Sequence, residues 1–291
     1  MAKAEAVCHG AITIVNAMAT GKGAALGIRL WTKATVTLTD DPGKISGRIT
    51  GDPTESTSLI GETVKTILNR YGGKKHGAIV ETVSNIPIAV GLKSSSAASN
   101  AVAAATLTAL GRQFDDIMVV RLGVKSSLRA RVSLTGAFDD ACACYFGGLV
   151  VTDNRTCKIL RRSKSSANGD HILLHVPRLK KYSGDIRKES FKRISELVNL
   201  AHKEALRGNT SLALTLNGIA YSSILGYDPS PVADALEAGA AAAGLSGKGP
   251  AVAAIVSSRK VDDVISAWER YPGDTIETAL NVRKASVRVL N

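Results

Sequence analysis

The sequence predicts an α+β fold of two domains, in which strands and helices do not alternate regularly. Apolar and polar residues alternate along much of the first 50 residues, which is typical of half-buried strands. Helical patterns then follow, without the repeated β–α–β order of a doubly wound sheet. With 291 residues, 45% of them hydrophobic, the chain is long enough for two closely packed domains, which we expect over residues 1–155 and 156–291.

The chain is strongly basic and poor in aromatic residues. Its net charge is +12 and its isoelectric point is about 9.6. This charge favours an anionic substrate, a nucleotide or RNA as a partner, although a soluble basic surface alone would also explain it. Because only 4% of the residues are aromatic, we expect a core of small and aliphatic side chains.

The cysteines indicate a reducing compartment. Cys8, Cys142, Cys144 and Cys157 form no CxxC pair and have no zinc-ligand spacing. No apolar run reaches the roughly 18 residues of a membrane-spanning helix, and the N-terminal residues do not match a signal peptide. We therefore expect a cytoplasmic protein without a membrane partner.

The first residues predict strands around a glycine-rich turn. Residues 4–18 have the pattern of one or two strands, and residues 20–27 (TGKGAALG) that of a flexible turn. The turn matches a dinucleotide fingerprint only loosely, because its third glycine is misplaced. A backbone that approaches a ligand, with Lys22 in the middle, is the functional interpretation, and a plain turn is the structural one.

A hairpin and a helix follow. Residues 34–38 and 45–50 alternate as two strands around the turn Asp40–Gly43. Ser56 or Thr57 begins a helix that continues to about Tyr71.

The stretch Ser84–Leu110 (SNIPIAVGLKSSSAASNAVAAATLTAL) is the strongest local signal. It follows a predicted strand over 77–83 and passes through three consecutive serines into an Ala-rich helix. A strand, a Gly/Ser loop and a helix start present free N–H groups and a positive helix end to an anion. The sequence therefore predicts a phosphate site here, with a simple serine helix cap as the alternative.

The rest of the chain is predicted in less detail. A helix over 115–123 precedes a second one that starts near Asp139 and Asp140 and ends at Gly147-Gly148. A polar segment over 153–170 is expected to be a hairpin edge or linker. The remaining predictions are strands over 149–152, 171–176 and 251–256, helices over 190–207, 212–225, 231–243 and 261–270, and two closing strands.

Common kinase loops are absent from the sequence. Gly247-Lys248 is followed by Gly249 instead of Ser or Thr, and residue 242 is Ala where a Walker A loop has its first glycine. The HRD and DFG motifs of protein kinases are also missing. A nucleotide would therefore need a different phosphate-binding loop.

Three stretches together resemble the GHMP superfamily of galactokinase, homoserine kinase, mevalonate kinase and phosphomevalonate kinase. Pro87–Ala97 (PIAVGLKSSSA) resembles its second motif, and Gly244–Pro250 (GLSGKGP) its third, a glycine loop. The residues Thr135–Asp140, with Gly147-Gly148 beyond them, resemble its catalytic-aspartate helix. The three occur in the family's order across nearly the whole chain. Residues 10–28 and the TGAFDDA stretch are most similar to archaeal-type shikimate kinases.

This resemblance implies an α+β GHMP-kinase fold with a nucleotide cleft between two domains, and transfer of phosphate from ATP to shikimate with Mg²⁺. Shikimate and ATP are then the expected partners, with no nucleic acid. The residues that it implies for ATP and phosphate binding are Pro87, Gly91, Leu92, Lys93, Ser94, Ser95, Ser96, Ala97, Gly247 and Gly249. A serine hydroxyl, Ser95 foremost, is also expected to ligate Mg²⁺, which prefers hard oxygen ligands.

The family's catalytic aspartate can be placed in two ways. Counting back from Gly147-Gly148 places it on Asp140, whereas counting forward from Gly136 places it on Asp139. We prefer Asp140, because residue spacing along a helix is more regular than along a loop. Several family members hold Mg²⁺ with a glutamate about one helix upstream, but no acidic residue lies between Asp116 and Asp139. Asp139 is therefore a second candidate metal ligand.

The acceptor carboxylate requires a cation, and its hydroxyls require polar partners. The candidates are Asn16, Thr20, Lys22, Arg129 and Arg131. A GHMP kinase for another small alcohol, such as homoserine or mevalonate, is one alternative function. A basic RNA-binding protein is another, although the sequence has few aromatic residues and no RRM or KH signature.

Overall fold

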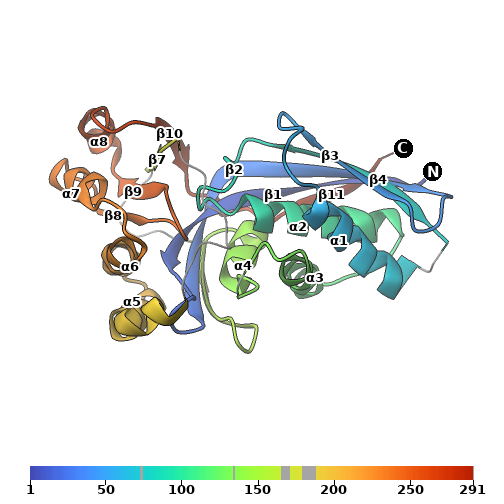
Figure 1. Cartoon of the computed structure of the whole chain (residues 1–291), viewed down its shortest axis with the longest axis horizontal. Helices are drawn as coiled ribbons and strands as arrows, with labels where there is room; N and C mark the ends of the chain where they lie inside the picture. Colours follow the sequence, from blue (N-terminus) through green and yellow to red (C-terminus); the bar gives the residue numbers. More distant parts are fainter. Residues whose placement is uncertain (73–74, 134, 165–170, 179–187, 291) are drawn as a thin grey trace.

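The computed structural model describes residues 1–72, 75–133, 135–164, 171–178 and 188–290. The chain forms two β-sheets, and helices cover each of them (Figure 1). This arrangement confirms the predicted α+β class. The first sheet has the strand order β11-β1-β2-β4-β3, and β5 pairs with both β2 and β6. Its strands are β1 (Lys3–Val15), β2 (Lys22–Thr39), β3 (Ile45–Thr50), β4 (Gly77–Ser84), β5 (Leu149–Asp153), β6 (Lys158–Ser163) and β11 (Ser286–Leu290).

Strands β1 and β2 form one long antiparallel hairpin that pairs from Lys3 with Thr37 to Val15 with Ala24, with register shifts after His9 and after Thr13. The flexible turn predicted over 20–27 is wrong, because β2 already begins at Lys22. Gly23 and Gly27 are strand residues against which a helix packs. A Cβ atom on Gly23 would lie 2.2 Å from Asp139 Oδ2, so the missing side chain makes room for the protein itself.

The predicted hairpin between residues 34–38 and 45–50 is also wrong. Strand β3 pairs in parallel with β4, and β4 takes the edge of β2 that a hairpin would need. The turn after β2 is held instead by the chain leading into β4, through bonds from Gly43 N to His76 O and from Ala78 N to Lys44 O. Helix α1 (Ser58–Ile67), with a π-helical turn over Leu68–Gly72, connects the two parallel strands.

Helices α1, α2 (Ser94–Ala109), α3 (Asp116–Arg129) and α4 (Phe138–Phe146) lie together on one face of the first sheet (Figure 1). Helix α2 is buried on nearly all sides, which its many alanines permit. Helix α3 continues to Arg129, six residues beyond its predicted end at Gly123. Gly123 lies inside the helix, and its missing side chain allows α3 to pack closely on α2. A Cβ atom there would lie 2.6 Å from Asn100 Oδ1.

The second sheet has the order β10-β7-β9-β8. The predicted helix over 231–243 is too long, because Gly239, with a φ of 102°, ends the helical turn, and Ala242 already belongs to a buried strand. The elements of this half are β7 (His171–Val176), a 3₁₀ turn (Lys188–Ile194), α5 (Ser195–Arg207), α6 (Thr210–Leu225), α7 (Ser230–Glu237), β8 (Ala242–Leu245), β9 (Val252–Val256), α8 (Val261–Trp268) and β10 (Asp274–Ala279).

The chain changes sheets between β6 and β7, and its last strand, β11, returns to pair with β1. The two ends of the chain therefore lie at the same end of the molecule (Figure 1). The domain boundary at residue 155 remains a prediction.

Candidate active site

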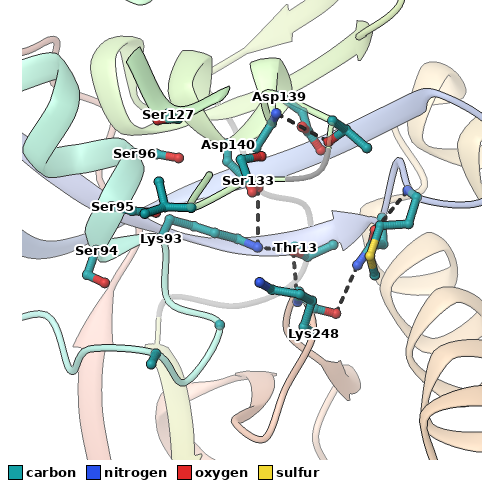
Figure 2. A pocket seen from close by; sticks show the side chains of 18 of the residues that line it. Thr13, Lys93, Ser94, Ser95, Ser96, Ser127, Ser133, Asp139, Asp140 and Lys248 are labelled. Atoms are coloured by element: carbon teal, nitrogen blue, oxygen red, sulfur yellow. Dashed lines mark hydrogen bonds and ion pairs between the residues drawn. The ribbon is translucent and has the colours of Figure 1, made fainter. Parts of the chain in front are cut away.

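A cavity of about 340 Å³ lies where the end of β1, the start of α2, the start of α4 and the β8–β9 loop meet (Figure 2). Eleven residues proposed from the sequence line it: Asn16, Gly91, Lys93, Ser94, Ser95, Ser96, Arg131, Asp139, Asp140, Gly247 and Gly249. Residues from three separate motifs are thus brought to one place.

The start of α2 is open toward this cavity. Lys93 is the N-cap residue, and no side chain caps the helix there. The N–H groups of the first turn, at Ser94, Ser95 and Ser96, have no partner within the helix. Together with the positive end of the helix dipole, they form a site suited to an anion.

Lys93 itself is buried, with only 9% of its surface exposed. Its Nζ donates a hydrogen bond of 2.5 Å to Thr13 Oγ1 and lies 3.3 Å from Asp140 Oδ1. Figure 2 shows this side chain reaching from the start of α2 toward both partners. The charge of this lysine is therefore held in the wall of the cavity.

The glycine loop between β8 and β9 is locked onto the loop before α2. Ser246 Oγ donates to Gly91 O over 2.8 Å and accepts from Thr13 N over 3.1 Å. Thr13 Oγ1 accepts a further bond of 2.9 Å from Gly247 N. Gly91, with a φ of 91°, has no room for a side chain, because a Cβ atom would lie 2.1 Å from Ser246 O.

Asp139 and Asp140 lie in different environments, although they are neighbours. Asp139 is 3% exposed, and its Oδ1 accepts a 2.7 Å bond from Asn154 Nδ2. Burial, followed by repulsion from Asp140, raises the pKa of Asp139 from 3.8 to about 7. Asp140 faces the cavity more openly and forms the ion pair with Lys93.

Backbone strain is concentrated around the cavity. Among the described residues, five that are not glycine have a positive φ, and Ala89, Lys93, Arg131 and Ala137 of these line the cavity. Such conformations cost free energy in residues with a Cβ atom and persist where the surroundings fix them. The backbone at these four residues is therefore held in a defined conformation.

Several residues proposed from the sequence lie outside the cavity lining. Leu92 is a core side chain, and Pro87 and Ala97 also do not reach the cavity. Arg129 points to α1, where its guanidinium lies 3.4 Å from Glu62 Oε1. The remaining two are Thr20, whose hydroxyl bonds the backbone of Lys22, and Lys22 itself, an exposed residue at the start of β2.

The structure also adds lining residues that were not among the candidate site residues proposed from the sequence. They are Thr13, Ala17, Met18, Glu55, Ile88, Ala89, Ser127, Val132, Ser133, Thr135, Ala137 and Lys248. Thr13 lies inside an apolar run, and a hydroxyl in such a run is a weak signal. Ser127 lies on the buried face of α3, beyond the helix end that the sequence predicts at Gly123.

Known proteins resemble this chain in sequence and in fold. The family model "GHMP kinases N terminal domain" matches residues 58–148, and "GHMP kinases C terminal" matches residues 232–274. A shikimate kinase of Methanosarcina acetivorans is 43% identical over 96% of this chain and 95% of its own. The chain belongs to the GHMP kinase family. A shikimate kinase of Pyrococcus abyssi is also 43% identical to this GHMP kinase, over 93% of this chain and 96% of its own.

Solved structures agree with the family at the level of the fold. Homoserine kinase from Cytophaga hutchinsonii superposes with a TM-score of 0.77 at 16% identity, covering 98% of this chain and 97% of its own. Lactococcus lactis galactokinase, complexed with galactose, has a TM-score of 0.76 at 14% identity, covering 98% of this chain and 95% of its own. In the part of this GHMP kinase that the structure describes, no helix is long and apolar enough to span a membrane.

Proposed function

We propose that this GHMP kinase transfers the γ-phosphoryl group of ATP to a hydroxyl group of shikimate, giving ADP and shikimate 3-phosphate. The observation that carries the proposal is the similarity to shikimate kinases over nearly the full length of both chains, at 43% identity. The cavity supports it, because an open helix start, a buried lysine and two carboxylates lie together there. Phosphoryl transfer mostly requires positioning and charge neutralisation.

The phosphates of ATP would lie against the start of α2. The N–H groups of Ser94, Ser95 and Ser96 are suited to phosphate oxygens, and Lys93 would supply a fixed positive charge beside them. The glycine loop at Gly247 and Gly249 would close over the other side without side-chain bulk. These contacts neutralise charge in place, without rearrangement during the reaction.

Asp140 is the residue that we propose as the base. As the acceptor oxygen bonds to the γ-phosphorus and the bond to the ADP oxygen breaks, the acceptor proton would pass to the Asp140 carboxylate. Asp140 faces the cavity beside Lys93, whereas Asp139 is enclosed by Asn154 and Gly23. Asp139 would therefore influence the ion pair of Asp140 and Lys93 without contacting the acceptor itself.

The cavity suits a magnesium ion that arrives with ATP. No group of three His, Cys, Asp or Glu side chains among the described residues could hold a metal ion alone. Mg²⁺ in such kinases relies on few protein ligands, with phosphates and water completing its shell. The hydroxyls of Ser95 and Ser96 at the cavity would hold it, and we prefer them to Asp139 because Asn154 already bonds that carboxylate. When bound, the ion neutralises phosphate charge.

Arg131 is the residue that we propose for the shikimate carboxylate. It lines the cavity, whereas Arg129 is paired with Glu62 on α1. Asn16 also lines the cavity, but its side chain already donates to Gly247 O and accepts from Met18 N. Asn16 therefore shapes the acceptor site more than it binds hydroxyls. We further place the enzyme in the cytoplasm, because its four cysteines are free thiols.

A panel of acceptors tests the proposal. Purified protein with ATP and Mg²⁺ is assayed for ADP release with shikimate, homoserine and mevalonate, and the product is identified by phosphorus NMR. We expect turnover with shikimate and at most traces with the others. Turnover of homoserine or mevalonate without shikimate would contradict the substrate, and tight, salt-sensitive RNA binding without ATP binding would contradict the enzyme class.

A further inference from the structure

A second, larger hollow of about 830 Å³ lies outside the active site. Its walls come from the π-helical turn after α1, from α3 as far as Lys125, from the end of α4 and from β6. Its lining residues are Arg70, Tyr71, Asp115, Asp116, Ile117, Met118, Arg121, Leu122, Lys125, Phe146, Ile159 and Arg162. We call it the basic groove. Helices α3 and α4 each line the active-site cavity at one end and the basic groove toward the other.

The basic groove carries four positive charges with which no carboxylate of the described residues forms an ion pair. Four of its side chains, Arg70, Arg121, Lys125 and Arg162, are cations exposed to solvent. Among the described residues, no carboxylate lies within ion-pair distance of any of these four. Arg121 and Lys125 are one helical turn apart, a spacing at which like charges repel and weaken a helix.

The two acidic side chains of the groove are already used by the protein. Asp115 caps α3, accepting a 2.7 Å bond from Met118 N. Asp116 accepts hydrogen bonds from Tyr145 OH and from Lys284 Nζ, at 3.0 Å and 2.9 Å. Neither carboxylate forms an ion pair with any of the four cations.

One guanidinium group lies on an apolar ring in the floor of the groove. Arg162 lies over the ring of Phe146, with 4.1 Å between its Cζ and the ring centroid. Arg121 lines the same groove from α3. Leu122 and Phe146 are buried beneath them, and Ile159 and Met118 are half-buried at the side.

We propose that the basic groove binds a small organic anion, with a carboxylate, sulfonate or phosphate group on an aromatic or alicyclic body. The cations would hold the charged group, and the floor would hold the apolar body. The volume is that of a site for a single small molecule, which favours this ligand over RNA. The inference concerns a different site from the proposed kinase activity and does not rest on it.

The methionines of the chain allow a local test. Only three are present: Met118 lines the basic groove, Met18 lines the active-site cavity, and Met1 is exposed at the N-terminus. With methyl-labelled methionine, NMR reports the two hollows separately in the full chain. Titration with anilinonaphthalene sulfonate, an anion with an apolar aromatic body, should shift and saturate the Met118 signal. Inorganic pyrophosphate, which lacks an apolar body, should leave this signal nearly unchanged.

A charge-matched pair of double variants locates the charged contact. Arg121→Gln with Arg162→Gln removes two cations of the groove, and Arg29→Gln with Arg259→Gln removes two exposed cations elsewhere. The first should raise the dissociation constant read at Met118 by about tenfold or more, since each charge-assisted hydrogen bond is worth that much. The second should change it less than about twofold, as expected for distant charges screened by salt.

Several results would overturn the proposal. One is a Met118 signal that does not saturate, or that moves equally in both double variants. Another is pyrophosphate binding as tightly as the aromatic sulfonate, which would remove the role of the apolar floor. A single-stranded oligonucleotide that displaces the sulfonate with a steep salt dependence would make the groove an RNA site instead.

Discussion

The Nζ atom of Lys93 lies 3.3 Å from Oδ1 of Asp140, and both side chains are largely buried in the wall of one cavity. The lysine stands at the start of α2 and the aspartate in the first turn of α4, so two helix starts meet at this pair. Thr13 joins them from β1 and connects them to the glycine loop. The proposed base therefore lies beside the proposed phosphate site, where a hydroxyl would attack.

Replacing Lys93 by glycine should separate its charge from its backbone role. We expect kcat to fall by about 100-fold, because a preorganised charge at the transferring phosphate is lost. Lys93→Gly should nevertheless be more stable than Lys93→Ala by roughly 1 kcal/mol, since only glycine adopts a φ of 67° without strain. Chemical denaturation measures the free energy of unfolding of the two variants. Equal values would contradict a free-energy cost of the left-handed backbone conformation at this position.

Gly23 should not tolerate a methyl group. A Cβ atom there would lie 2.2 Å from Asp139 Oδ2, so Gly23→Ala should displace Asp139, lower the melting temperature and reduce kcat. Gly61→Ala is the matched control, because that helical position has open space around it, and it should stabilise by about 0.5–1 kcal/mol. Similar melting temperatures for the two variants would contradict the close packing of α4 on β2.

Asp139 should make stability depend on pH. Because its pKa is raised to about 7, the folded chain keeps a proton that the unfolded chain releases near pH 4. The stability present below pH 4 from this group is lost as the pH rises toward 7. Asp139→Asn should remove that loss, so it should gain stability over the parent at about pH 8 but little at about pH 4.5, as urea denaturation would measure. Equal differences at both pH values would contradict a buried carboxyl.

Two neighbouring arginines form a natural comparison for acceptor binding. Arg131→Gln should raise the KM for shikimate by about tenfold, because an ion-paired hydrogen bond to the carboxylate is lost. Arg129→Gln should leave that KM within about twofold, since its guanidinium pairs with Glu62 away from the cavity. Steady-state kinetics with each substrate varied in turn would measure both. A larger rise of the KM in Arg129→Gln than in Arg131→Gln would contradict the assignment of the shikimate carboxylate to Arg131.

The sequence predicted the elements with clear local signals. The serine run, the two glycines after α4 and the alternating strands each impose their structure through the nearest residues, and these predictions match α2, α4 and β1. Two of its errors came from glycines whose reason lies elsewhere in the fold. Gly23 and Gly123 resemble turn and stop signals in sequence, but each makes room for a side chain of a distant element.

The residues of the candidate site were likewise predicted only in part. Motif residues such as Lys93 and Asp140 could be found because their types and spacing are unusual. Thr13 could not, because its role depends on a strand end meeting the glycine loop far along the chain. The choice between Arg129 and Arg131 was likewise open, since only the packing of α3 on α1 turns one guanidinium toward Glu62 and away from the cavity.

The measurement that tests the central claim most directly is the turnover of Asp140→Asn. With ATP, Mg²⁺ and shikimate, we expect kcat to fall by about 100-fold to 10,000-fold, as for loss of a general base. The dissociation constant for ADP, read from the Met18 methyl signal, should stay within about threefold of the parent's, because the start of α2 is unchanged. Asp139→Asn serves as the comparison. Full activity in Asp140→Asn together with an inactive Asp139→Asn would contradict the assignment of the base.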